Sequence, residues 1–179
     1  VSLPRPEYNK MMKDLIAALK ANGPRIKPKV RLLYTGGHAD NPEFFDLLQQ
    51  NDAHVVSDNT GFGTRAADVL IREDGDPLEA IIDYYFEEKP AATRQMGTQV
   101  ERMERLLDLV KQYKADGVVA SRLYMCDLWA FEHFLMRKRL HENNVPFLEL
   151  EVDYTPEGQG QIKTRVQAFV ESLADRQTA

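Results

Sequence analysis

Apolar residues recur along this chain with two spacings, one typical of amphipathic helices and the other of short buried strands. In residues 8–20 the apolar side chains follow i, i+3, i+4 and i+7 spacing, which predicts an amphipathic helix. Compact apolar runs bounded by turn residues predict four strands, at residues 30–34, 54–57, 118–121 and 147–152.

Helix-start signals indicate where the remaining helices begin. Asn41 and Pro42 supply an N-cap and a first-turn proline for a helix that runs through Leu48. An Asp-Pro-Leu-Glu sequence at residues 76–79 has the same signals and predicts a helix over residues 77–88. Apolar periodicity predicts further helices at about residues 100–110, 128–142 and 162–173.

Alternating strands and helices predict an α/β fold with a parallel sheet, because right-handed crossovers place helices on both faces. Four strands favour the order 2-1-3-4 of a doubly wound, flavodoxin-like domain. We expect residues 30–179 to form this domain and residues 1–29 to form a helix and linker before it.

Composition narrows the class of protein. The chain has 179 residues, of which 43% are hydrophobic and 28% charged, as in a globular protein. Its net charge of −5 argues against general nucleic-acid binding, and no apolar run approaches the ~20 residues of a membrane span. A single cysteine, Cys126, cannot form an internal disulfide, so a cytoplasmic location is expected.

Ligands of doubly wound folds bind beyond the carboxyl ends of the strands, which here are followed by residues 35–38, 57–60, 121–126 and 153–154. After the first predicted strand, Thr35, Gly36 and Gly37 could offer backbone amides to an anion, although Gly-Gly is equally typical of a tight turn. Neither a P-loop nor a Gly-x-Gly-x-x-Gly motif is present, so ATP or NAD binding does not follow.

The loop after the second predicted strand carries Asp58, Thr64 and Arg65. An arginine at this edge could hold a carboxylate or phosphate with two parallel hydrogen bonds. An Asp58–Arg65 ion pair that fixes the loop is the alternative. The charged runs at residues 101–105 and 137–139 are interpreted as solvated helix faces.

Cys126 follows the third predicted strand and precedes a helix. A helix N-terminus stabilises a thiolate, which makes a nucleophile or a metal ligand. A buried, unreactive cysteine is one alternative, and a protease-like nucleophile with His38 or His133 as its base is another. The histidines are not spaced as the ligands of a zinc site.

Several motifs occur together in one order along the chain. They are Asp-Gly-Val-Val at 116–119, Cys-Asp at 126–127, Asn-Val-Pro-Phe-Leu at 144–148 and Glu-Val-Asp-Tyr at 151–154. The run Gly-Gln-Ile-Lys-Thr-Arg-Val-Gln-Ala-Phe-Val-Glu closes the series at 160–171, and Val-Val-Ser-Asp at 55–58 with Gly-Thr-Arg at 63–65 precedes it. From about residue 31 to 173 the chain resembles the carboxyl-terminal half of subunits of the 2-hydroxyacyl-CoA dehydratase family, which includes the benzoyl-CoA reductases.

This resemblance implies a cofactor. Each catalytic subunit of the family has two flavodoxin-like domains with a 4Fe–4S cluster between them, bound by three cysteines. One of these follows the third strand of the second domain, and Cys126 occupies that position. The other two would belong to the preceding domain, from which the helix and linker of residues 1–29 would also come. Both are absent here, so the chain is either an excised carboxyl-terminal domain or a degenerate, non-catalytic member.

The resemblance also implies a reaction and partners. An ATP-dependent activator protein supplies an electron, and water is lost from a 2-hydroxyacyl-CoA thioester by a radical route. A paralogous second subunit, the activator and the acyl-CoA are the expected partners, and the isolated chain is expected to be inactive. The alternatives are a benzoyl-CoA reductase subunit, a structural homologue without a cluster, or a separate domain that binds FMN or another phosphorylated ligand.

Overall fold

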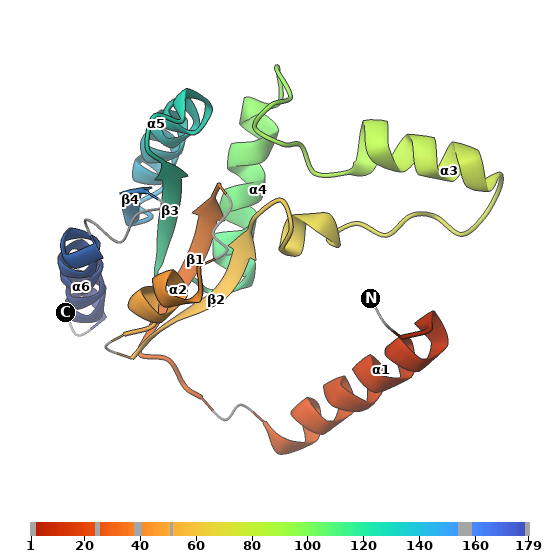
Figure 1. Ribbon diagram of the computed structural model, residues 1–179, viewed down its shortest axis with the longest axis horizontal. Coiled ribbons are helices and arrows are strands. Elements are labelled where there is room, and N and C mark those ends of the chain that lie inside the picture. The colour runs from red at the N-terminus through yellow and green to blue at the C-terminus, as the bar shows by residue number, and fades with distance from the viewer. Residues whose placement is uncertain (1–2, 24–25, 38–40, 51, 154–158, 178–179) are drawn as a thin grey trace.

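The computed structural model describes residues 3–23, 26–37, 41–50, 52–153 and 159–177. Its centre is a parallel sheet of four strands in the order β2-β1-β3-β4 (Figure 1). The strands are β1 (Val30–Gly36), β2 (Ala53–Asn59), β3 (Gly117–Leu123) and β4 (Phe147–Val152). The predicted fold class and strand order are therefore confirmed.

Helices connect the strands at the predicted places. They are α1 (Arg5–Asn22), α2 (Pro42–Leu48), the 3-10 turn η1 (Thr64–Ala66), α3 (Pro77–Asp83), the π-helical turn η2 (Tyr84–Glu88), α4 (Gln99–Gln112), α5 (Asp127–Glu142) and α6 (Gln159–Arg176). The Asn41 side chain accepts a hydrogen bond from the Glu43 amide at 2.9 Å, and Asp76 caps α3 through the amides of Leu78 and Glu79. Both predicted N-caps are confirmed.

One face of the sheet is covered by α2 and α6. Leu32 and Tyr34 of β1 pack there against Phe44 of α2 and against Val170 and neighbouring apolar residues of α6. The Tyr34 hydroxyl is buried and lies 2.5 Å from the Ser121 hydroxyl of β3. Burial raises the pKa of Tyr34 to about 12, so it stays a neutral phenol that joins the two central strands.

The opposite face is covered by α4 and α5. Leu33, Val118 and Ala120 of the sheet pack against Leu106 of α4, Leu140 of α5 and other apolar residues of these helices. Because both faces are covered, the central strands carry nearly continuous buried residues rather than an alternating pattern.

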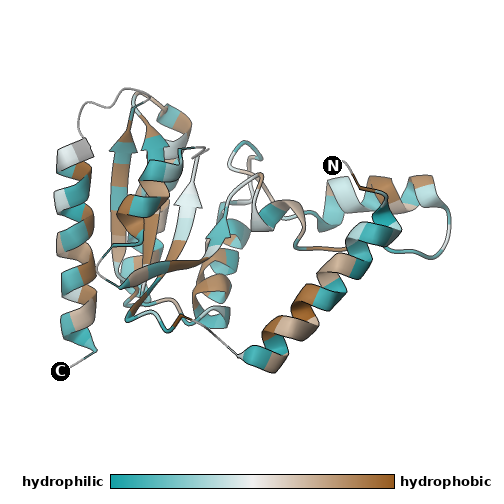
Figure 2. Cartoon of the chain, turned by 60° about the horizontal axis from the view of Figure 1, so that its bottom comes forward, coloured by the Kyte–Doolittle hydropathy of each residue, from teal (hydrophilic) through white to brown (hydrophobic). Residues whose placement is uncertain are grey.

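Two helical segments project from this layered domain (Figures 1 and 2). In α1 no residue is buried, and its apolar stripe, including Met11, Leu15 and Leu19, is about half exposed. The α3–η2 segment likewise exposes Leu78 and Phe86. The helix predicted at residues 8–20 is confirmed as a helix, but the described part of the chain does not cover its apolar stripe.

None of the described helices combines the length and the apolar character that crossing a bilayer requires.

Candidate functional site

The carboxyl ends of β1, β2 and β3 meet at one edge of the domain, as the strand order requires. Thr35 lies inside β1 rather than in a loop, is fully buried and donates a hydrogen bond to the Asn59 carbonyl at 3.5 Å. The Gly37 amide donates to the Ser121 carbonyl at 3.0 Å, so it extends the sheet and is not free to bind an anion.

Gly36 has a φ of 132°, and a Cβ at this position would collide with the Ser121 backbone. Glycine is therefore needed for close approach of β1 and β3, which is a structural use of the Gly-Gly pair. His38 lies outside the described residues.

Asp58 organises the loop that follows β2. Its carboxylate accepts hydrogen bonds from the amide and hydroxyl of Thr60, at 2.9 and 2.6 Å, and from the amide and hydroxyl of Thr64, at 3.2 and 2.9 Å. Burial alone would raise the pKa of Asp58, but these hydrogen bonds hold it below its ordinary value. The two threonines, and not the ion pair with Arg65 considered above, fix this loop.

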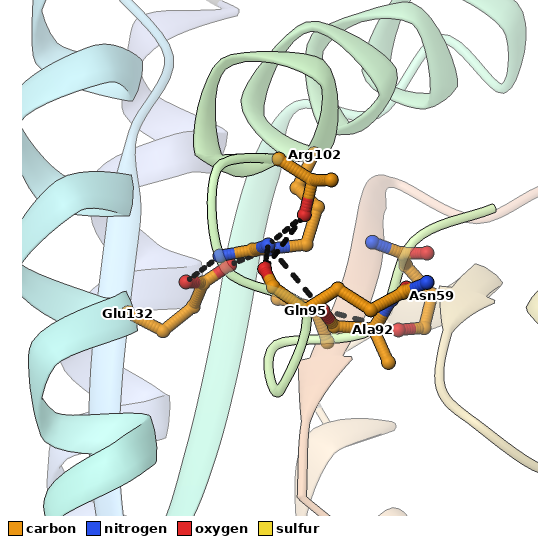
Figure 3. A network of polar contacts seen from close by, with 7 residues as sticks. Asn59, Ala92, Gln95, Arg102 and Glu132 are labelled. Carbon is orange, nitrogen blue, oxygen red and sulfur yellow. Dashed lines mark hydrogen bonds and ion pairs between the residues drawn. The ribbon is translucent and has the colours of Figure 1, made fainter.

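The charged run at residues 101–105 is a solvated face only in part, because its two glutamates are exposed whereas Arg102 is buried. Arg102 is only 7% exposed and forms two hydrogen bonds of 2.8 Å to the carboxylate of Glu132 on α5, which is 3% exposed. Its remaining nitrogen donates to the carbonyls of Ala92 and Gln95 and to the Thr98 hydroxyl (Figure 3). Arg102 thus joins α4, α5 and the segment that precedes α4.

A small cavity lies beside this network. Thr35, Asn59, Arg65, Trp129, Arg105 and Glu132 are among its lining residues. Arg65 lies in η1 and is partly buried. Burial lowers the pKa of Arg65, and the neighbouring positive charges of Arg105 and Arg102 lower it further. Sequence reasoning selected Arg65 and Thr35 but did not find Asn59 or Trp129, because no local motif indicates that they face the same cavity.

Cys126 is the N-cap residue of α5 and is partly exposed. Its amide donates to the Leu123 carbonyl at 3.1 Å, and its own carbonyl accepts from Ala130 at 2.9 Å. The preceding Met125 has a φ of 61°, so the chain makes a sharp turn between β3 and α5. The thiol therefore lies at the carboxyl edge of the sheet and is not the fully buried cysteine considered above.

His133 is not placed to act as a base for Cys126. It lies seven residues further along α5, about 10 Å of helix rise, and is fully buried. Its Nδ1 lies 3.4 Å from the Glu149 carboxylate, which also pairs with Arg122 and Arg137. Burial lowers the pKa of His133, and the attraction of Glu149 only partly offsets this.

Within the described ranges no group of three or more histidine, cysteine, aspartate or glutamate residues is arranged to hold a metal ion. Cys126 is the one cysteine of the chain, and among the described residues it belongs to no such group.

A doubly wound parallel sheet with helices on both faces defines an α/β domain of the flavodoxin-like class, and Cys126 and Arg65 follow its strand ends. Within this class, the chain belongs to the 2-hydroxyglutaryl-CoA dehydratase, D-component family, whose sequence model matches residues 1–173. The match confirms the family resemblance and extends it to α1.

Relatives with named functions agree with this membership. A provisionally named dehydratase subunit of Escherichia coli K12, YjiM, is 30% identical over 84% of this chain and 39% of its own length. The (R)-phenyllactyl-CoA dehydratase beta subunit of Clostridium sporogenes is 24% identical over 94% of the chain and 45% of its own length. A benzoyl-CoA reductase subunit of Thauera aromatica is 21% identical over 96% of the chain and 45% of its own length. The chain therefore spans less than half the length of these relatives.

Proposed function

We propose that this chain is part of a subunit of a 2-hydroxyacyl-CoA dehydratase, in which Cys126 is one ligand of a 4Fe–4S cluster. The observation that carries the proposal is the place of Cys126 in a chain of this family. Cys126 is partly exposed, occupies the N-cap position of α5 and follows β3 at the edge where doubly wound folds bind ligands.

The residues present fit one part of a cluster site. Cys126 occupies the N-cap position of α5, and the turn at Met125 brings it to the sheet edge, where a cluster between two domains could reach it. A 4Fe–4S cluster needs about four ligands and, when bound, supplies single electrons at low potential. The chain has a single cysteine, so the remaining ligands would come from outside it.

The partners follow from the same proposal. Two dehydratase relatives are named as beta subunits, which supports a second, paralogous subunit. An acyl-CoA would be the substrate and an ATP-dependent activator the electron donor, in the cytoplasm of an anaerobically growing cell. Cys126 would bind iron, while α5 holds it at the domain edge.

Aromatic-ring reduction is the second candidate, because a benzoyl-CoA reductase subunit matches the chain with nearly the same identity as the phenyllactyl-CoA dehydratase subunit. The purified complete complex would distinguish the two when it is given a 2-hydroxyacyl-CoA or benzoyl-CoA. A homologue without a cluster would act on neither and would contain no iron.

The test is expression of the complete subunit with its partner in the absence of oxygen, followed by iron analysis. Cys126→Ala should lose most of the iron of this subunit, whereas Tyr124→Phe, two residues away and exposed, should retain it. Equal iron in both variants would refute the ligand role of Cys126.

A further inference from the structure

The carboxyl edge of the sheet contains a positive charge that the described residues do not neutralise. We propose that Arg65, together with Arg105, binds one anionic oxygen from the carboxylate or phosphate terminus of a ligand. The site itself is independent of Cys126. Only the suggested source of the anion, an acyl-CoA, rests on the function proposed above.

The three arginines at this edge differ in their partners. Arg102 is paired with Glu132, and Arg105 is paired with Asp68 of the loop that follows η1. No hydrogen bond or ion pair reaches the Arg65 guanidinium from the residues that the structure describes, and Glu132 and Asp58 attract it only from a distance. The cavity is therefore left with one uncompensated positive charge.

One further donor beside Arg65 lacks a partner. The Arg105 Nε is buried and is not hydrogen-bonded by the described residues. A buried donor without a partner lowers stability, and an anionic oxygen can accept its hydrogen bond. The Asn59 Oδ1 is also buried without a described partner, but it is an acceptor and so does not bind the anion.

The space beside Arg65 limits what can bind. The cavity has a volume of about 10 Å³, enough for a group the size of one water molecule. Trp129 and Met136 form apolar parts of its wall. A single oxygen atom of a carboxylate or phosphate matches this size, with the rest of the group outside the cavity, while a nucleotide or a flavin ring does not.

An unpaired, partly buried charge next to two like charges lowers stability unless a ligand compensates it. A charged residue that lowers stability in this way is typical of a binding site rather than of a scaffold. Of the residues suggested by sequence for an anion, Thr35 and Arg65 line the cavity, whereas the Gly37 amide and the Asp58 carboxylate are engaged within the protein.

Trp129 is the only tryptophan of the chain and lines the cavity, so its fluorescence can report binding directly. The 179-residue protein would be titrated with acetate, inorganic phosphate and CoA at constant ionic strength. We expect the emission of Trp129 to change saturably with acetate, with the phosphate-bearing probes, or with both. The responding probe identifies whether a carboxylate or a phosphate is bound.

Arg65→Gln should weaken this binding by about tenfold or more, because it removes a charge-assisted pair of hydrogen bonds. Arg72→Gln is the matched control, since Arg72 pairs with Asp83 and does not line the cavity. The Arg72→Gln control should bind the anion with the same affinity as the unaltered protein.

Thermal unfolding gives a second, independent readout. The binding anion should raise the Tm of the unaltered protein but not that of Arg65→Gln, and without anion the Tm of Arg65→Gln should be equal or higher. No fluorescence change and no Tm increase with any probe in the tens of millimolar would overturn the proposal. A lower Tm of Arg65→Gln with an unchanged titration would also overturn it, because Arg65 would then be neutralised within the protein.

Discussion

At the scale of single residues, this domain is distinguished by charged and titratable groups that lie inside it. Arg102 and Glu132 form a buried pair between α4 and α5, and His133 is enclosed beneath α5 next to Glu149. Each group depends on a partner that is distant in sequence. Removing one partner leaves the other desolvated, so such sites are sensitive to conservative substitutions.

Glu132→Gln should therefore lower the free energy of unfolding by about 3 kcal/mol, because Arg102 would remain buried without a counter-charge. Denaturant unfolding monitored by circular dichroism measures this change. Glu142→Gln, on the same helix but exposed and paired with Arg139, should change the free energy by less than about 0.5 kcal/mol. Equal effects of the two variants would contradict a buried pair.

His133 should make stability depend on pH. Because burial holds the pKa of His133 below its ordinary value, the unfolded chain binds a proton at higher pH than the folded chain does. Stability should then decrease as the pH falls below about 6.5, the ordinary value of histidine.

Unfolding free energies measured at about pH 7.5 and 5.5, on either side of that value, should show this loss in the unaltered protein. His133→Leu should show a smaller loss, and the control His141→Gln, at an exposed position of the same helix, should behave as the unaltered protein does. The carboxyl group of Glu149 titrates at lower pH, since its pKa is held below its ordinary value mainly by Arg137 and His133, against the opposing effect of burial. If His133→Leu loses as much stability between the two pH values as the unaltered protein, another group causes the pH dependence.

At the scale of elements, the helices divide into those that cover the sheet and those that project from it. On α6, Val166, Val170 and Leu173 are each 2% exposed and complete one core. On α1 no residue is buried, although its sequence has a clear apolar stripe. Isolated helices are only marginally stable in water, so α1 needs a partner that the described chain does not supply.

A chain that begins at residue 28 should therefore keep its Tm within about 2 °C, because deleting α1 removes no buried contact. It should also aggregate less, since exposed apolar surface is lost. Differential scanning calorimetry measures the first effect and light scattering the second. Leu173→Ala in the full chain is the comparison and should destabilise by about 2–5 kcal/mol, because it opens a cavity in the core.

At the scale of the whole molecule, the chain supplies a layered domain with both sheet faces covered, but it could supply only part of the proposed cluster site. Both faces of its sheet are covered, whereas its single thiol could provide only one of about four cluster ligands. The chain also spans less than half of its relatives. The proposed chemistry thus belongs to a larger assembly.

Anaerobic reconstitution of the 179-residue chain with iron and sulfide should leave it colourless after desalting, with far less than one cluster per chain. One thiolate cannot replace the several ligands that a cluster requires. Iron analysis and visible absorbance are the measurements. A brown protein with about four irons per chain would show that residues other than cysteine complete the site.

The elements that were predicted are those with strong local signals. Asn41 and Asp76 cap their helices because a side-chain oxygen reaches amides two or three residues away, which sequence spacing alone determines. The strand ends were less accurate, since β1 includes Thr35 and Gly36 and β3 continues to Leu123. Pairing with neighbouring strands extends these elements, and the pairing is not local.

The sequence by itself determined the class of fold, the strand order, the family and the place of Cys126 after β3. Such features depend on hydrophobic periodicity, helix capping and motif order, which the local sequence determines. Only the tertiary structure decided that Arg102 and His133 are buried and that Arg65, Asn59 and Trp129 share one cavity. The physical reason is that burial and charge balance depend on which surfaces the folded chain brings together, and an arginine on a helix has the same local pattern whether it faces water or a glutamate of the next helix.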